Sequence, residues 1–316
     1  MSITANDVPD QSGRRAVVTG ANSGIGLETT RELSRHGVTV VMACRNLERA
    51  EEAAREIRSD VPDADLRLEG CDLASLESVR SFAGRLEGGV DVLVNNAGTM
   101  AIPRSETDDG FETQFGVNHL GHFALTGLLL GNLRRETDEE RPARVVTVSS
   151  ALHERGEIDF TDLQGERSYD PWSAYAQSKL ANVLFAYELE RRLRTAGADV
   201  QSVAVHPGYA DTKLQFRGID DRGSAIRAAI RRLSNAVFAQ SAARGALATL
   251  YAATAPDVEG GAYYGPSGIL NMRGPPERQA SSDRSYDRET ARRLWAVSKE
   301  LTGVEYALPK PAASAP

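Results

Sequence analysis

Short runs rich in β-branched and other apolar residues alternate with longer helical patterns along the first two thirds of this chain. The alternation predicts parallel strands joined by crossover helices. Because such crossovers are right-handed, the series predicts an α/β fold with a Rossmann-like, doubly wound parallel sheet and helices on both faces. The predicted strands are Arg15 to Thr19, Val38 to Ala43, Leu66 to Glu69, Asp91 to Val94, Arg144 to Ser149 and Val200 to Val205.

The helical patterns between these strands complete a single predicted domain over residues 13–308. An extension, 1–12, precedes it, and a Pro/Ala/Ser-rich tail, 309–316, is expected to be disordered. Residues 211–240 break the alternation and are either a substrate lid or a surface excursion, with the lid favoured because long irregular segments are often functional. The predicted helices are Gly24 to His36, Leu47 to Ser59, Ser75 to Leu86, Asp109 to Arg135 and Tyr175 to Thr195.

Composition narrows the class of partner and the compartment. A net charge of -7 argues against a nucleic-acid or anionic-membrane partner. Two cysteines form no disulfide framework, which favours a reducing compartment. The first residues lack the apolar region of a secretory signal, and the run Phe115 to Leu133 is too often interrupted by polar residues for a membrane span. A cytoplasmic protein without a membrane anchor is therefore expected.

The segment Thr19 to Gly26 follows a predicted strand and opens a helix. Its glycines permit a tight turn and the close approach of a pyrophosphate, and the free N–H groups of the helix favour the anion. The alternative is a purely structural turn, but the strand-turn-helix context favours a dinucleotide site. The residues assigned to this site are Gly20, Asn22, Ser23, Gly24, Ile25 and Gly26.

The end of the second strand indicates which dinucleotide binds. NAD-binding sheets usually carry an acid there, but this chain has Arg45 followed by Asn46. A guanidinium can bind a 2′-phosphate through charge-assisted hydrogen bonds, so NADP is favoured over NAD. The alternative is that Arg45 only extends into solvent at a strand end.

Tyr175 and Lys179 lie four residues apart and share one face of a predicted helix. A nearby ammonium favours the phenolate and would lower the tyrosine pKa toward the working range of a general acid-base group. Ser149 and Ser150 end a predicted buried strand, where a hydroxyl can bind a substrate carbonyl, although such pairs are often only turn residues. Asn118 stands in an apolar helix and needs hydrogen-bond partners.

Taken in order, these motifs resemble the short-chain dehydrogenase/reductase family. The resemblance covers about residues 13–212 and includes Cys71-Asp72-Leu73, Asn95-Asn96-Ala97-Gly98 and His206-Pro207-Gly208. The chain is most similar to the subgroup that contains retinol dehydrogenases, through Ala43 to Asn46, Val148 to His153, Ser178 to Asn182 and Arg293 to Leu301. Membrane-bound members of that subgroup carry an N-terminal hydrophobic anchor, which this sequence lacks.

The resemblance implies a role for each matching residue. Tyr175 would exchange the proton with the reacting oxygen, Lys179 would lower its pKa and hold the nicotinamide ribose, Ser150 rather than Ser149 would orient the carbonyl, and Asn118 would position a water in a proton relay. Asp72 and Leu73 would frame the adenine. The remaining cofactor contacts would be Asn95, Ala97 and Gly98 at the adenosine half and Pro207, Gly208 and Thr212 at the nicotinamide end.

The predicted function is therefore NADP(H)-dependent hydride transfer to or from the carbonyl or alcohol of a lipophilic small molecule. The alternatives are a C=C reductase like the protochlorophyllide-reducing relatives and a non-catalytic NADP sensor, which would be expected to lose the tyrosine or lysine. Family members often form dimers or tetramers through the two long helices, which leaves a homo-oligomer open. His119 and His122 lack further ligands for a metal, so no metal site is predicted, and they are interpreted as helix-packing or hydrogen-bonding residues. Trp295 is interpreted as a packing residue of the last helix.

Overall fold

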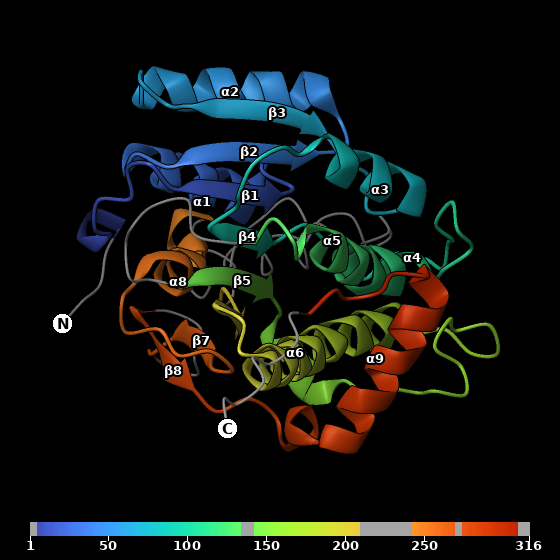
Figure 1. The fold of residues 1–316 in the computed structure, drawn as a ribbon. Helices are drawn as coiled ribbons and strands as arrows, with labels where there is room; N and C mark the ends of the chain where they lie inside the picture. The colour runs from blue at the N-terminus through green and yellow to red at the C-terminus, as the bar shows by residue number, and fades with distance from the viewer. Residues whose placement is uncertain (1–4, 134–141, 209–241, 269–273, 309–316) are drawn as a thin grey trace, which may run out of the picture.

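An eight-stranded sheet forms the centre of the molecule in the computed structural model, which describes residues 5–133, 142–208, 242–268 and 274–308 (Figure 1). The strand order is β3-β2-β1-β4-β5-β6-β7-β8. Adjacent strands pair in parallel except β7 and β8, which are antiparallel. The strands are β1 Arg15–Thr19, β2 Thr39–Cys44, β3 Leu66–Gly70, β4 Val92–Asn95, β5 Ala143–Val148, β6 Val200–Val205, β7 Tyr263–Pro266 and β8 Pro276–Gln279.

The helices cover both faces of this sheet, as predicted for a doubly wound fold. Alternate strand residues point to opposite faces, so Val18 packs with α1, α2 and α8, whereas Val17 packs with α3, α5, α6 and α9. The helices are α1 Gly24–Arg35, α2 Leu47–Asp60, α3 Leu76–Arg85, α4 Thr113–Phe115, α5 Gly121–Leu129, α6 Pro171–Ala196, α8 Ala242–Thr254 and α9 Arg288–Thr302.

The helix predicted from Asp109 to Arg135 begins later and is not uniform. Gly110 adopts a left-handed turn with φ of 81°, so the helix starts only after Glu112, whose carboxylate accepts the N–H groups of Gln114 and Phe115. A π-helical turn, Gly116–Leu120, separates α4 from α5. The expected end of this helix, residues 134–135, lies outside the described residues.

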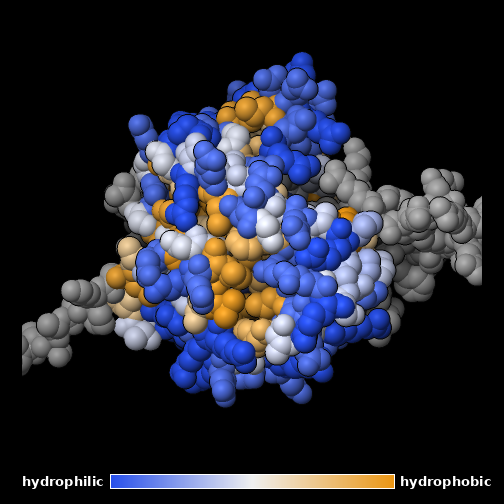
Figure 2. All heavy atoms as spheres, turned by 90° about the vertical axis from the view of Figure 1, so that its right-hand side faces the viewer, coloured by the Kyte–Doolittle hydropathy of each residue, from blue (hydrophilic) through white to orange (hydrophobic). Residues whose placement is uncertain are grey.

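The C-terminal helix α9 lies across α5 and α6, where Trp295 packs with its ring centroid 5.1 Å from that of Phe123 and 5.9 Å from that of Phe185. The prediction that Trp295 is a packing residue is confirmed. Half-buried Phe160 and Leu301 pack against an adjacent cluster of buried apolar residues. Figure 2 views this side of the molecule and shows apolar atoms among hydrophilic ones.

Two predicted segments, the lid at 211–240 and the tail at 309–316, lie outside the described residues. Within the described part of the chain, no helix combines the length and apolar character needed to cross a bilayer.

Candidate active site

The glycine turn joins β1 to α1 at the carboxyl edge of the sheet. Gly20 and Gly24 adopt φ values of +65° and +56°, which residues with a Cβ rarely adopt. A Cβ on Gly26 would lie only 2.4 Å from the carbonyl oxygen of Gly20, so the turn tolerates only glycine there. The backbone N–H groups of Ala21 and Asn22 donate to the buried thiol of Cys44, which ties the turn to the end of β2.

A network that the sequence analysis did not assign holds this turn. The hydroxyl oxygen of Thr19 accepts the N–H groups of Asn96 and Ala97 at 2.9 and 3.0 Å, and it lies 2.9 Å from Nε2 of His122. Nδ2 of Asn96 donates to the Thr19 carbonyl at 2.8 Å. Asn96 was visible in the sequence as part of an Asn pair at a strand end, but no pattern linked His122 to Thr19.

The first turn of α1 differs from those of other helices in the fold. Ser23 is its N-cap residue, yet its side chain makes no capping hydrogen bond. Asn46, Ser75 and Asp170 do cap α2, α3 and α6. Among the described residues, the N-cap side chain therefore leaves the first N–H groups of α1 uncapped, as an anion-binding helix end requires.

Arg45 follows β2 directly and extends into solvent, with 68% of its side chain exposed and its Nε 4.0 Å from Oδ2 of Asp72. It is therefore available at the same edge as the glycine turn. Asn46 is engaged as the N-cap of α2, with its side chain accepting the N–H of Arg49. Leu73 is buried in the core behind this edge.

The residues predicted to lie beside the adenosine half of the cofactor begin with Asn95. It is fully buried at the end of β4, and its amide donates to the Thr126 hydroxyl at 2.9 Å. Ala97 and Gly98 are half-buried in the loop that follows. Gly208 has a φ of 71° and donates its N–H to Nδ1 of His206, whereas Thr212 lies outside the described residues.

Tyr175, Ser150 and Lys179 meet where β5 ends beside α6. The Ser150 hydroxyl lies close enough to the Tyr175 hydroxyl to act on its pKa, and Nζ of Lys179 lies 5.7 Å from the centre of the Tyr175 ring. Nζ also donates to the Val148 carbonyl at 3.1 Å, which directs the ammonium toward the strand end. Helix α6 starts at Pro171, four residues before the predicted start at Tyr175, so both residues lie in well-formed helix.

The neighbouring serines have different partners. The Ser149 hydroxyl is buried and donates to the Lys179 carbonyl at 2.8 Å. Ser150 is half-buried, and its hydroxyl oxygen accepts the Leu152 N–H at 3.2 Å. Only the Ser150 hydroxyl approaches Tyr175.

Asn118 lies in the π-helical turn and is fully buried. Its Oδ1 accepts the Thr99 N–H at 2.8 Å, and its Nδ2 donates to the Thr99 carbonyl and to Ser178, both at 2.9 Å. A Cβ on Gly98 would lie 2.9 Å from Oδ1 of Asn118 and 3.6 Å from Nζ of Lys179. Asn118 therefore lies near Lys179, with its side-chain amide fixing the loop that contains Gly98.

Burial controls the electrostatics of this cluster. It raises the pKa of Tyr175 to about 12, and the hydrogen bond from Ser150 opposes that rise. Burial also lowers the pKa of Lys179 to about 8. The expected lowering of the Tyr175 pKa by the Lys179 ammonium is not seen in this geometry, in which the ammonium lies over the ring, 5.7 Å from its centre, and donates to the Val148 carbonyl of β5.

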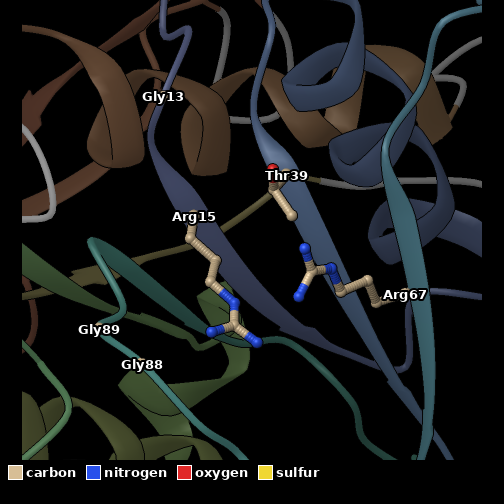
Figure 3. Close-up of a pocket in the computed structure, with 6 residues that line it drawn as sticks. All are labelled: Gly13, Arg15, Thr39, Arg67, Gly88 and Gly89. Carbon is tan, nitrogen blue, oxygen red and sulfur yellow. The ribbon is translucent and has the colours of Figure 1, made fainter.

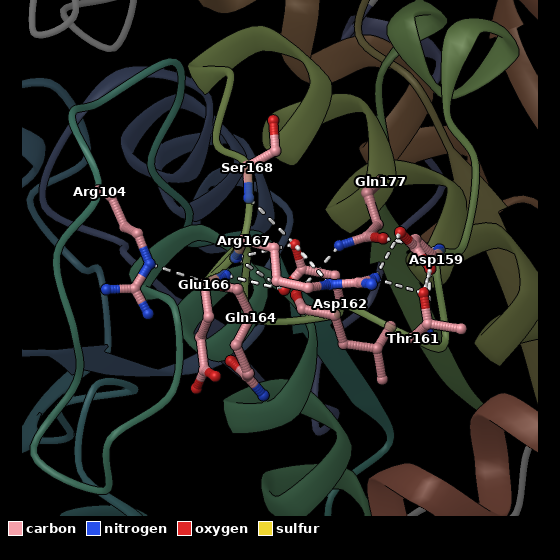
Figure 4. Close-up of polar contacts among 10 residues, drawn as sticks. Arg104, Asp159, Thr161, Asp162, Gln164, Glu166, Arg167, Ser168 and Gln177 are labelled. Atoms are coloured by element: carbon pink, nitrogen blue, oxygen red, sulfur yellow. Dashed lines mark hydrogen bonds and ion pairs between the residues drawn. The ribbon is translucent and has the colours of Figure 1, made fainter.

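The loop before α6 is folded around one carboxylate. Asp162 accepts the N–H groups of Glu166, Arg167 and Ser168, and Gln177 of α6 bonds the Asp159 N–H and the Leu163 carbonyl (Figure 4). These contacts hold the start of α6, and with it Tyr175, against the rest of the site.

No His, Cys, Asp or Glu cluster suited to a metal occurs among the residues that the structure describes. Nε2 of the buried His119 lies 2.8 Å from the Ser298 hydroxyl, in accord with a packing role. A separate hollow, lined by Arg15, Thr39 and Arg67, opens at the amino ends of β1, β2 and β3 (Figure 3). It lies at the edge opposite to Tyr175, because parallel strands carry their amino ends to one side.

The sequence matches the short chain dehydrogenase family over residues 14–222, and the chain belongs to that family. It is an oxidoreductase of the class that acts on CH–OH or C=O groups.

Mouse retinol dehydrogenase 12 is 43% identical over 299 residues, covering 93% of this chain and 88% of the relative. Mouse polyprenol dehydrogenase is 44% identical, covering 94% and 86%. A solved, uncharacterised protein of Mycobacterium paratuberculosis is 42% identical with a TM-score of 0.81 and covers 98% of this chain and 100% of its own. The Pseudomonas aeruginosa RhlG/NADP complex is 25% identical with a TM-score of 0.62, covering 80% and 94%.

Proposed function

We propose that this enzyme transfers hydride between NADP(H) and the carbonyl or alcohol of a lipophilic small molecule, with Tyr175 as the general acid-base group. The observation that carries the proposal is the juxtaposition of the Ser150 and Tyr175 hydroxyls where β5 ends beside α6, with Lys179 one turn further along α6.

The cofactor supplies or accepts the hydride, and the side chains of the chain handle the oxygen and its proton. In reduction, the hydroxyl groups of Ser150 and Tyr175 bind the substrate carbonyl oxygen and stabilise the charge that develops on it. Tyr175 then donates its proton to that oxygen, and in oxidation it accepts the proton from the alcohol. Because burial raises the pKa of Tyr175, the phenol is well suited to remain a proton donor at neutral pH.

Lys179 supports this exchange through its position. An ammonium favours a phenolate electrostatically at the moment when Tyr175 gives up its proton. Its pKa of about 8 leaves it mostly protonated at neutral pH. Asn118 would complete a proton path by fixing the loop at Gly98 and by holding a water near Lys179.

Two features at the carboxyl edge of the sheet support NADP(H) as the cofactor: the first turn of α1 and Arg45 at the end of β2. The uncapped first turn of α1 and the close approach of Gly26 to Gly20 suit a pyrophosphate. Arg45 is exposed at the end of β2, where an acid would repel a 2′-phosphate. Asp72 lies within 4.0 Å of Arg45 and would orient the guanidinium rather than bind the phosphate.

A lipophilic substrate is supported by the relatives, whose names refer to retinol and to polyprenol. The test is a consumption screen with NADPH and NADH over aldehydes and ketones of increasing apolar length. The proposal expects carbonyl reduction that is faster with NADPH and improves with apolar length. Reduction of conjugated C=C bonds alone, or tight NADPH binding without turnover of any class, would contradict it.

A further inference from the structure

His153 is a buried histidine beside the site to which the mechanism gives no task. It lies in the short 3-10 helix Ala151–Arg155, directly after Ser150, and only 1% of the residue is exposed. Its Nδ1 lies 2.8 Å from the Ser150 carbonyl oxygen, and its Nε2 lies 3.0 Å from the backbone N of Ser282.

These two partners fix the protonation of the ring. A backbone N–H can only donate, so Nε2 accepts the hydrogen bond from Ser282. The ring proton is therefore on Nδ1, which donates to the Ser150 carbonyl. Burial lowers the pKa of His153, in agreement with a neutral ring.

The same carbonyl receives a second hydrogen bond from the same residue, because the backbone N–H of His153 donates to it at 3.0 Å. Ser150 is thereby held in an extended conformation with φ of -152° and ψ of 154°. Since the Ser150 hydroxyl oxygen accepts the Leu152 N–H, its own proton remains available to Tyr175.

We propose that His153 is a positioning residue that orients the Ser150 hydroxyl by donating from Nδ1 to the Ser150 carbonyl, while the Ser282 N–H keeps the ring proton on Nδ1. The inference rests on the proposed function, because it assigns His153 an effect on the reaction only through Ser150. One imidazole therefore contacts both Ser150 and Ser282, which are about 130 residues apart in the sequence, and Ser282 acts on the site only by fixing the tautomer of His153.

Two polar substitutions separate the roles of the two ring nitrogens of His153. His153→Asn retains an N–H near the position of Nδ1, whereas His153→Gln reaches toward Nε2 and loses the donor to Ser150. We expect His153→Gln to lower kcat by about tenfold or more, because misplacement of a reacting group costs up to about 10²-fold. His153→Asn should remain within about threefold of the wild type, and the Kd for NADPH should be unchanged in both.

Tyr187→Phe provides a matched control. It removes the hydrogen bond of 2.7 Å between Tyr187 and the Ser281 hydroxyl, next to Ser282, and leaves both ring contacts of His153 in place. We expect this variant to lower the melting temperature and to leave kcat unchanged.

The decisive measurement is a double-mutant cycle, using the best carbonyl substrate of the screen and NADPH at saturation. If His153 acts through Ser150, His153→Gln should lower kcat by less than about twofold in a Ser150→Ala background. Equal losses for the Asn and Gln variants, an equal loss in both backgrounds, or normal kcat in His153→Gln would overturn the inference. A Ser150→Ala enzyme with wild-type kcat would instead contradict the proposed function itself.

Discussion

Ser149 and Ser150 are adjacent in the sequence but differ in what their hydroxyls can reach. The Ser149 hydroxyl donates to the Lys179 carbonyl inside the protein, whereas the Ser150 hydroxyl lies beside that of Tyr175. A backbone that leaves a strand in extended form points successive side chains in opposite directions, which explains the division.

Replacing each serine by alanine tests this division. Ser150→Ala should lower kcat by about 10² to 10³, the usual effect of removing one oxyanion donor, with nearly unchanged NADPH affinity. Ser149→Ala should lower stability by about 1 kcal/mol and change kcat much less. Steady-state kinetics and chemical unfolding check both, and equal, mild kinetic effects would refute the role of Ser150.

Arg45 carries the cofactor preference in the proposed function. Arg45→Asp should weaken NADP(H) binding by about 1.5 to 3 kcal/mol, because a charge-assisted contact is replaced by repulsion, and should favour NAD(H). Fluorescence titration with both cofactors measures the change. Arg55→Asp, an equal change of charge at an exposed position of α2, should leave the preference as it is. An unaltered ratio of affinities in Arg45→Asp would rule out the assignment.

Among the elements, the β1–α1 turn has the tightest geometry. Gly26→Ala would place a Cβ 2.4 Å from the Gly20 carbonyl oxygen, so the backbone itself must move. We expect both a loss of stability and a rise of the NADPH Kd by about tenfold or more, since phosphate contacts depend on this backbone.

Gly84→Ala is the control for that substitution. Gly84 lies within α3, and a Cβ there would meet no atom within 4 Å. This variant should be stabilised by about 0.5 to 1 kcal/mol, because alanine is the better helix former, with an unchanged Kd. Thermal unfolding and NADPH titration of both variants make the comparison, and an unperturbed Kd in Gly26→Ala would contradict the pyrophosphate assignment.

Local patterns predicted the strands β1 to β6 within one or two residues, because buried parallel strands read as apolar runs bounded by turns. They did not predict the π-helical turn around Asn118 or the four-residue advance of α6 to Pro171. The π-helical turn depends on tertiary contacts such as Asn118 with Thr99, which leave no period in the sequence. The α6 start does have a local signal, Asp170 before Pro171, which the focus on Tyr175 overlooked.

For the candidate site, the sequence predicted the residues at the reacting centre but not those that hold them in place. Tyr175, Lys179 and Ser150 carry recognisable spacing and come together in the structure. Thr19, Asn96, His122 and His153 hold that arrangement from distant parts of the chain, and their contacts exist only once the sheet is assembled. The pKa of Tyr175 could not be predicted because it depends on burial, which the spacing from Lys179 does not report.

On the scale of the whole molecule, the C-terminal helix α9 packs on the face of the sheet that is covered by α5 and α6, near the candidate active site. Trp295 packs against both α5 and α6, and the Ser298 hydroxyl contacts His119 next to Asn118. Association of two copies through this part of the two long helices would have to displace α9.

Four buried histidines, His153 and the three described next, have lowered pKa values and make the stability of the molecule sensitive to acid. Burial lowers the pKa of His119 to about 3 and the pKa values of His122 and His206 to about 4. These folded-state values lie below the unfolded value near 6.5, so the unfolded chain binds more protons as the pH falls. The stability from the neutral rings is complete above about pH 6.5 and is lost toward pH 4.

Each such histidine changes the free energy of unfolding by up to about 1.4 kcal/mol per pH unit in that window. Urea unfolding at pH 7 and at pH 5 should therefore show a marked loss of stability at the lower pH. His206→Gln should reduce the slope. The same free energy of unfolding at both pH values would show that these rings are not held neutral.

The central claim is that Tyr175 exchanges the proton with the reacting oxygen, and single-turnover carbonyl reduction by Tyr175→Phe tests it most directly. The substitution removes one oxygen and keeps the ring, so the helix and the NADPH Kd should persist. The rate should fall by about 10² or more, because the acid-base step is lost. A folded Tyr175→Phe protein that binds NADPH and reduces its carbonyl substrate at a near-normal rate would contradict the account.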